Sequence, residues 1–72
     1  MACINPDGTL TASAQMMLNA LRTPATPVEL AQRTERPLFR VRSTLRELAE
    51  AGLVEEHEGR YRLTAEGASR IQ

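Results

Sequence analysis

The sequence has 72 residues and a mass of 8.0 kDa, which leaves room for one domain with one small core. Aromatic residues make up 3% of it, so the core must be aliphatic, and closely packed helices are favoured over a β-sandwich. No stretch approaches the ~20 apolar residues of a membrane span, and the N-terminus lacks the pattern of a secretory signal. We therefore expect a soluble, cytoplasmic protein with no membrane partner.

The net charge is zero, but the charges are segregated along the chain. Residues 33–46 contain five arginines and one glutamate, whereas residues 47–58 contain five glutamates and no arginine. Every basic residue is arginine, which suits planar, bidentate recognition of anions and is equally explained by a composition bias. The pattern predicts one basic and one acidic region within a single small domain.

The N-terminal part divides into an arm and a first helix. The turn residues of 5–8, close to the single cysteine Cys3, predict a flexible arm over residues 1–9 and a domain over 10–72. A helix over about 11–22, capped by Thr9 or Thr11 and ended before Pro24, is predicted by apolar residues at helical spacing. These residues are Leu10, Ala14, Met17, Leu18 and Leu21, and Met16 is expected to help fill the core.

Two further helices follow at short spacing. Thr26-Pro27-Val28-Glu29 combines a threonine cap, a proline at the first helical position and a capping-box glutamate, and predicts a helix that runs to about Arg33. We expect it to bury Val28, Leu30 and Ala31 and to hold a Glu29–Arg33 ion pair. A third helix is predicted over about 37–51, with Leu38, Val41, Leu45 and Leu48 on its buried side.

The last third of the sequence changes its pattern. Gly52 suits the left-handed position after a helix, with Leu53 turning back to contact Leu48. Residues 53–63 then read as a β-hairpin with a glycine-containing turn, and Thr64 can cap a short final helix. The predicted fold is therefore mainly α with a small β-hairpin wing: a winged helix-turn-helix with a three-helix core, a two-stranded wing and a short C-terminal helix.

Two segments in this order, 29–54 and 59–67, resemble the helix-turn-helix and the wing of MarR-like bacterial winged-helix regulators. The first ends in Leu45-Arg46-Glu47-Leu48 … Gly52-Leu53-Val54, and the second contains Arg62-Leu63-Thr64-Ala65-Glu66-Gly67. The resemblance covers about residues 10–71. It implies a small transcriptional regulator that binds double-stranded DNA sequence-specifically, with the 37–51 helix in the major groove and the 53–63 hairpin on the adjacent backbone.

The residues that would contact DNA follow from the helical wheel and from the wing. If Val41, Leu45 and Leu48 face the core, the opposite face of the third helix is polar and basic. Arginines four residues apart repel each other, so we interpret them as placed for an external anion. The predicted contacts are Arg36 just before the helix, Phe39, Arg40, Arg42, Ser43 and Arg46 on it, and Arg60 and Arg62 on the wing.

Alternatives stay open for several of these residues. Arg46 can instead pair with Glu50, and Arg60 and Arg62 can be neutralised across the hairpin by Glu55 and Glu56. Phe39 suits a DNA contact, a protein contact or, if the helix is rotated, the core. A rival function is a winged-helix module for protein interaction or dimerisation, anchored by Leu38 and Phe39 and without direct DNA binding.

Nothing in the sequence predicts catalysis. His57 is the single histidine, and no spacing of histidine and cysteine suits a metal. No phosphate-binding glycine loop and no nucleophile beside a base are recognisable. We therefore expect a non-enzyme with no catalytic residue, metal, cofactor or small-molecule effector, and we leave a homodimer open.

Overall fold

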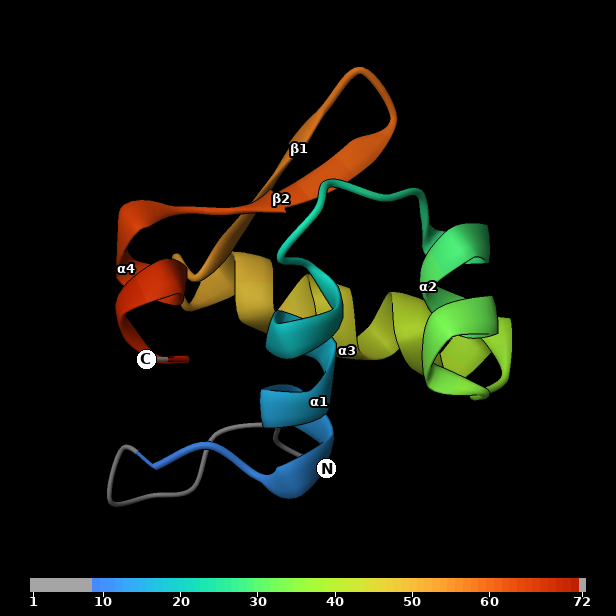
Figure 1. The fold of residues 1–72 in the computed structure, drawn as a ribbon, viewed down its shortest axis with the longest axis horizontal. Helices are drawn as coiled ribbons and strands as arrows, with labels where there is room; N and C mark the ends of the chain where they lie inside the picture. The colour runs from blue at the N-terminus through green and yellow to red at the C-terminus, as the bar shows by residue number, and fades with distance from the viewer. Residues whose placement is uncertain (1–8, 72) are drawn as a thin grey trace.

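The computed structural model describes residues 9–71, which form four helices and one antiparallel hairpin (Figure 1). Their order is α1 (Ala12–Ala20), α2 (Pro27–Thr34), α3 (Leu38–Glu50), β1 (Val54–His57), β2 (Arg60–Leu63) and α4 (Ala65–Ser69). The expected mainly α fold with a two-stranded hairpin is confirmed. Most of the predicted arm, residues 1–8 with Cys3, lies outside the described residues.

Helix α1 is shorter than the predicted 11–22. Its cap is Thr11, whose hydroxyl accepts a hydrogen bond from the amide of Ala14 at 3.2 Å. At the other end, the amides of Leu21 and Arg22 donate to the carbonyls three residues back, at 3.0 and 3.3 Å. The last turn therefore tightens before Pro24 is reached, and the α-helix ends at Ala20.

Helix α2 begins as the sequence predicts. The Thr26 hydroxyl accepts from the amide of Glu29 at 3.2 Å, and the Glu29 carboxylate accepts from the amide of Thr26 at 2.9 Å, which completes the capping box. The helix ends at Thr34, and Glu35 follows in the left-handed region with φ of 55°. That conformation lets the chain turn sharply into α3 without a glycine.

Helix α3 is the longest helix of the described part, and its C-terminus has the predicted form. Pro37 and Ala51 flank it, so it is one residue shorter at each end than the predicted 37–51. The amide of Leu53 donates to the carbonyl of Leu48 at 2.9 Å, and Gly52 has φ of 79°. This is the Schellman arrangement expected from Gly52 and Leu53.

The hairpin pairs Val54 with Leu63 and His57 with Arg60, and it turns through Glu58 and Gly59, which both have positive φ. A further pairing joins the loop before α2 to β2. The amide of Tyr61 donates to the carbonyl of Ala25 at 2.8 Å, and the amide of Ala25 donates back at 3.1 Å. The sequence analysis missed this pairing, which ties the α1–α2 loop to the hairpin.

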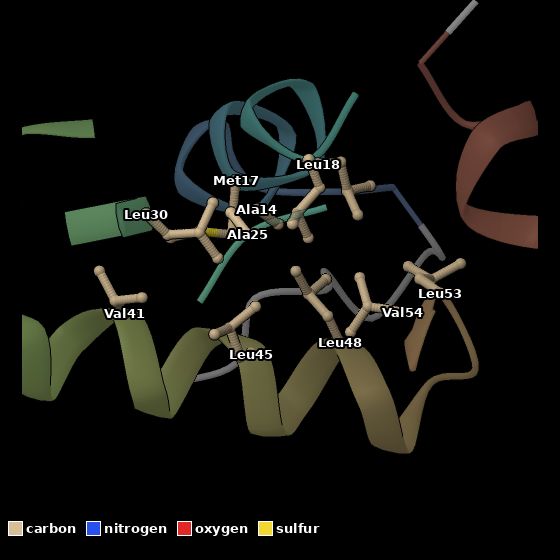
Figure 2. Close-up of a cluster of buried hydrophobic side chains, with 11 residues drawn as sticks. Ala14, Met17, Leu18, Ala25, Leu30, Val41, Leu45, Leu48, Leu53 and Val54 are labelled. Atoms are coloured by element: carbon tan, nitrogen blue, oxygen red, sulfur yellow. The ribbon is translucent and has the colours of Figure 1, made fainter. Parts of the chain in front are cut away.

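One aliphatic core joins the three longer helices to the start of the hairpin. Figure 2 shows the side chains of α3 directed toward those of α1, with Leu30 beside them. The buried members are Ala14, Met17, Leu18, Leu21, Ala25, Leu30, Val41, Leu45, Leu48, Leu53 and Val54. At least nine-tenths of the exposable apolar surface of each is removed from water, and this burial is the main term that stabilises the fold.

Three expectations about burial are corrected. Val28 is 52% exposed and Met16 is 42% exposed, because each lies on the side of its helix turned away from the shared core. Leu38 is only half-buried, since it stands in the first turn of α3 at the margin of the contact.

Within residues 9–71, no helix combines the length and the apolar character that crossing a membrane requires.

Candidate functional site

The outer side of α3 gathers most of the residues that the sequence singled out. We call Arg36, Phe39, Arg40, Arg42, Ser43 and Arg46 the arginine face. All are exposed except Arg36, which is half-exposed just before the helix. The buried side of the same helix holds Val41, Leu45 and Leu48, so the predicted orientation of the helix is confirmed.

The arginines of this face carry charges that the described part of the protein does not neutralise. Among residues 9–71, the guanidinium groups of Arg36, Arg42 and Arg46 make no hydrogen bond or ion pair. The Arg46–Glu50 pair that was left open does not form. The guanidinium of Arg40 lies 5.9 Å from the centre of the Phe39 ring, a cation–π contact at the surface.

Phe39 is 68% exposed, and it is the most exposed large apolar side chain of the described residues. The alternative that placed it in the core is therefore wrong. Its neighbours along the helix face are arginines and Ser43 rather than other apolar residues. A single aromatic ring thus stands among unpaired positive charges.

The hairpin contributes mixed charges instead of a basic surface. Arg62 donates through Nε to the Glu55 carboxylate at 2.8 Å, directly across the strands, so the neutralising alternative is confirmed for this residue. Arg60 is opposite His57 and forms no ion pair with Glu55 or Glu56 in the described structure. The positive charge of Arg62 is thereby compensated locally.

Two open hollows lie on the surface of the described residues. The α3 groove, of about 600 Å³, runs between the outer side of α3 and the hairpin and is lined by Pro27, Arg42, Arg46, Ala49, Glu50, Glu56 and Tyr61. A second hollow, of about 620 Å³, lies at the hairpin turn and is lined by Pro24, Thr26, His57, Glu58, Gly59, Arg60 and Arg62. Both therefore carry charges of both signs.

A metal-binding arrangement is not assembled among the described residues. Over residues 9–71, no three side chains of the metal-ligating types come together. The side chain of His57 is well exposed and lies 3.8 Å from the Glu58 carboxylate.

Two charged residues of α2, Arg33 and Glu29, form hydrogen bonds with the backbone and not an ion pair with each other. Arg33 does not form the expected ion pair with Glu29; its Nη1 donates to the carbonyls of Ala20 and Thr23, at 3.1 and 3.2 Å. It thereby satisfies carbonyls at the C-terminal end of α1. The pKa of Glu29 is lowered, chiefly because its carboxylate accepts a hydrogen bond from the Thr26 amide.

Comparison with known proteins gives two matches. The family model described as the HemN C-terminal domain matches residues 14–69. The crystal structure of CalO1, a methyltransferase in calicheamicin biosynthesis, in its SAH-bound form, matches with 36% sequence identity and a TM-score of 0.66. The match covers 82% of this chain and 18% of the methyltransferase chain, so this chain spans less than a fifth of that protein. Among curated proteins, none matches.

These matches overturn the functional prediction. The chain is related to the HemN C-terminal domain and to a methyltransferase, not to MarR-type regulators, so the DNA-binding and transcription-regulation prediction is wrong. The helix and hairpin geometry that suggested it is shared by proteins of unrelated function. The prediction that the arginine face contacts DNA, together with Arg60 and Arg62, therefore has no remaining support.

The comparisons also speak against the expectation of a non-enzyme. CalO1 is an enzyme, and the fold of this chain is therefore enzyme-related. The rival prediction of an interaction or dimerisation module gains no support from either match.

The family match includes the buried residues of α1, the whole of α2 and α3, and the hairpin. It also includes Gly67, the buried glycine of α4. It thus covers every described element except the first residues of α1. The chain belongs to the HemN C-terminal domain family.

Proposed function

We propose that this chain is an accessory domain of a methyltransferase-type enzyme, a helical unit that supports a larger catalytic part and does not itself hold the methyl donor. The observation that carries the proposal is the match to CalO1, with 36% identity over 82% of this chain but only 18% of the methyltransferase. A unit of that size is a minor part of the enzyme.

The surface of the domain supports an accessory role. Small-molecule sites bury most of their ligand in a cleft that is largely apolar. The two hollows of the described residues are instead open to solvent, and each has charged residues of both signs in its lining, such as Arg42 and Glu50 in one and Glu58 and Arg60 in the other. Neither offers the enclosure that an adenosine ring system needs.

We further propose that the fold is of the winged-helix class. Three helices packed around one core, followed by a hairpin, support this assignment. The backbone pairing of Ala25 with Tyr61 adds a third extended segment beside β2, which fastens the hairpin to the helices. A hairpin held in this way is a rigid part of the surface and not a free arm.

A segment exchange tests the accessory role. The part of CalO1 that matches this chain is replaced by the chain, and SAH binding by the chimera is compared with that of CalO1. If the two segments serve the same supporting role, the chimera folds and retains SAH affinity. The matched control carries Leu45→Asp in the exchanged segment, which places a charge in the core and is expected to unfold it.

A further inference from the structure

We propose that the arginine face is a docking surface for an acidic protein segment that carries an apolar side chain. The inference rests on the proposed function, in which an accessory domain must contact a larger protein part, and it names the surface and the chemistry of that contact. Phe39 would supply the apolar anchor, and the surrounding guanidinium groups would bind carboxylates.

The first argument is that the arginines of the described residues differ in whether their guanidinium groups have a protein partner. Several arginines elsewhere have protein partners: Arg22 donates to Ile71, Arg33 to Ala20, and Arg62 to Glu55. Arg60 on the hairpin is the exception, with no ion pair or hydrogen bond of its guanidinium group within residues 9–71. On the arginine face, Arg36, Arg42 and Arg46 have none within residues 9–71. Most of the unpaired arginines of the described residues are therefore on the outer side of α3 or just before it.

The second argument is that this concentration opposes folding. Arg42 and Arg46 stand four residues apart within α3, a spacing at which like charges destabilise a helix. A carboxylate placed between two such guanidinium groups would remove the repulsion and accept hydrogen bonds from both. The chemistry of the face is thus complementary to an acidic partner.

The third argument is the position of Phe39. It is 68% exposed, whereas the buried core of the described residues consists of aliphatic and methionine side chains. Aromatic residues and arginine are both enriched at protein interfaces relative to the rest of the surface. Water removed from this ring on docking would stabilise the complex and strengthen the neighbouring ion pairs.

The α3 groove favours a protein segment over a nucleic-acid backbone. Glu50 and Glu56 line the same groove as Arg42 and Arg46, so a continuous phosphate backbone along α3 would meet two carboxylates. A protein segment can place carboxylates only beside the arginines and turn backbone amides or hydroxyls toward the glutamates. The acidic end of the groove therefore limits the extent of the docking surface.

The test is a titration of the 72-residue chain with a synthetic probe. The probe is a fluorescein-labelled peptide of about 15 residues, built from glutamate, alanine and leucine with leucines three and four residues apart. Fluorescence anisotropy measures its affinity, and amide shifts in ¹⁵N-labelled protein locate it. We expect shifts centred on Phe39, Ser43 and Arg46, and an affinity that falls severalfold between about 50 and 300 mM salt.

Variants separate anchored docking from simple charge attraction. Phe39→Ala and the double variant Arg42→Gln/Arg46→Gln are each expected to lower the affinity about tenfold or more. The control Arg70→Gln removes one positive charge from the α4 end and is expected to change it less than twofold. The proposal is overturned if the probe does not bind, or if Phe39→Ala leaves its affinity unchanged.

A polyanion control completes the test. A probe with serine in place of leucine and a random-sequence DNA duplex should each bind at least about tenfold more weakly than the acidic peptide. Equal binding of the duplex would mean that the face attracts any polyanion and would overturn the proposal. The segment exchange in CalO1 does not depend on this result, so the two proposals can fail separately.

Discussion

The α-carbon of Gly67 in α4 is packed directly against the carbonyl oxygen of Leu53, so closely that a β-carbon on Gly67 would overlap that backbone atom. Two hydrogen bonds hold the same region together. The Thr64 amide donates to the Leu53 carbonyl at 3.1 Å, and the Thr64 hydroxyl donates to the Gly52 carbonyl at 2.6 Å. The end of α3 and the start of α4 are thereby joined at one point.

Replacing Gly67 tests this junction. Gly67→Ala is expected to lower the free energy of unfolding by about 2 kcal/mol or more, because the obstructing atoms belong to the backbone and cannot rotate away. Chemical denaturation followed by circular dichroism measures the change. Gly52→Ala is the comparison: its β-carbon meets open space, so its cost comes only from the positive φ and should be near 1 kcal/mol. A Gly67→Ala protein as stable as the parent would show that the junction is looser than described.

The hairpin turn offers a stabilising substitution. Glu58 has φ of 53° and precedes Gly59 with φ of 82°, the conformation of a two-residue turn that asparagine-glycine prefers. Glu58→Asn is therefore expected to raise the free energy of unfolding by about 0.5 kcal/mol, since asparagine tolerates the left-handed region better than glutamate. Thermal melting checks it. Glu56→Asn, in the middle of β1, should be neutral or destabilising; the reverse order of the two variants would contradict the turn assignment.

Arg33 is expected to matter for stability although it is exposed. Arg33→Ala removes the hydrogen bonds to the Ala20 and Thr23 carbonyls and should destabilise the domain by about 1 kcal/mol. The control is Arg36→Ala, whose side chain has no such partners and whose loss should cost less than about 0.5 kcal/mol. Urea unfolding of the two variants side by side gives the comparison. Equal effects would mean that the carbonyl contacts do not contribute.

The capping box predicts one pH dependence. Because the pKa of Glu29 is lower in the folded protein than its ordinary value, its ionised form contributes stability that is fully present above that ordinary value of 4.5. The contribution is lost as the pH falls through the lowered pKa. An NMR titration of the Glu29 carboxyl should find its pKa below this ordinary value. Thr26→Pro, which removes the donating amide, should move the Glu29 pKa back toward its ordinary value; an unchanged pKa would contradict this cause.

The local elements could be predicted because their signals are local. The Thr26 cap, the Gly52 terminus and the change to strand pattern after Leu53 lie within a few residues of the features that they determine. The exposure of Val28 and Met16 depends on where neighbouring helices pack, and the Ala25–Tyr61 pairing joins residues far apart in the sequence. Periodicity contains no information about either.

The placement of the site residues was also predictable, whereas their function was not. Helical spacing correctly predicted that Phe39, Arg42 and Arg46 face away from the core, since the buried positions of α3 define the opposite face. The same outward arginines suit phosphate, carboxylate or a protein surface, so the residue types alone do not select a partner. The proposed accessory role rests on the match to a segment of an enzyme, because the shape of the fold alone does not indicate a function.

The most direct test of the accessory role is the dissociation constant of SAH for the CalO1 chimera that carries this chain. We predict a value within about threefold of that of CalO1, a difference below 1 kcal/mol, with binding lost or strongly weakened in the Leu45→Asp control. A well-folded chimera that binds SAH more than about 100-fold more weakly would contradict the account, as would SAH binding by the isolated 72-residue chain.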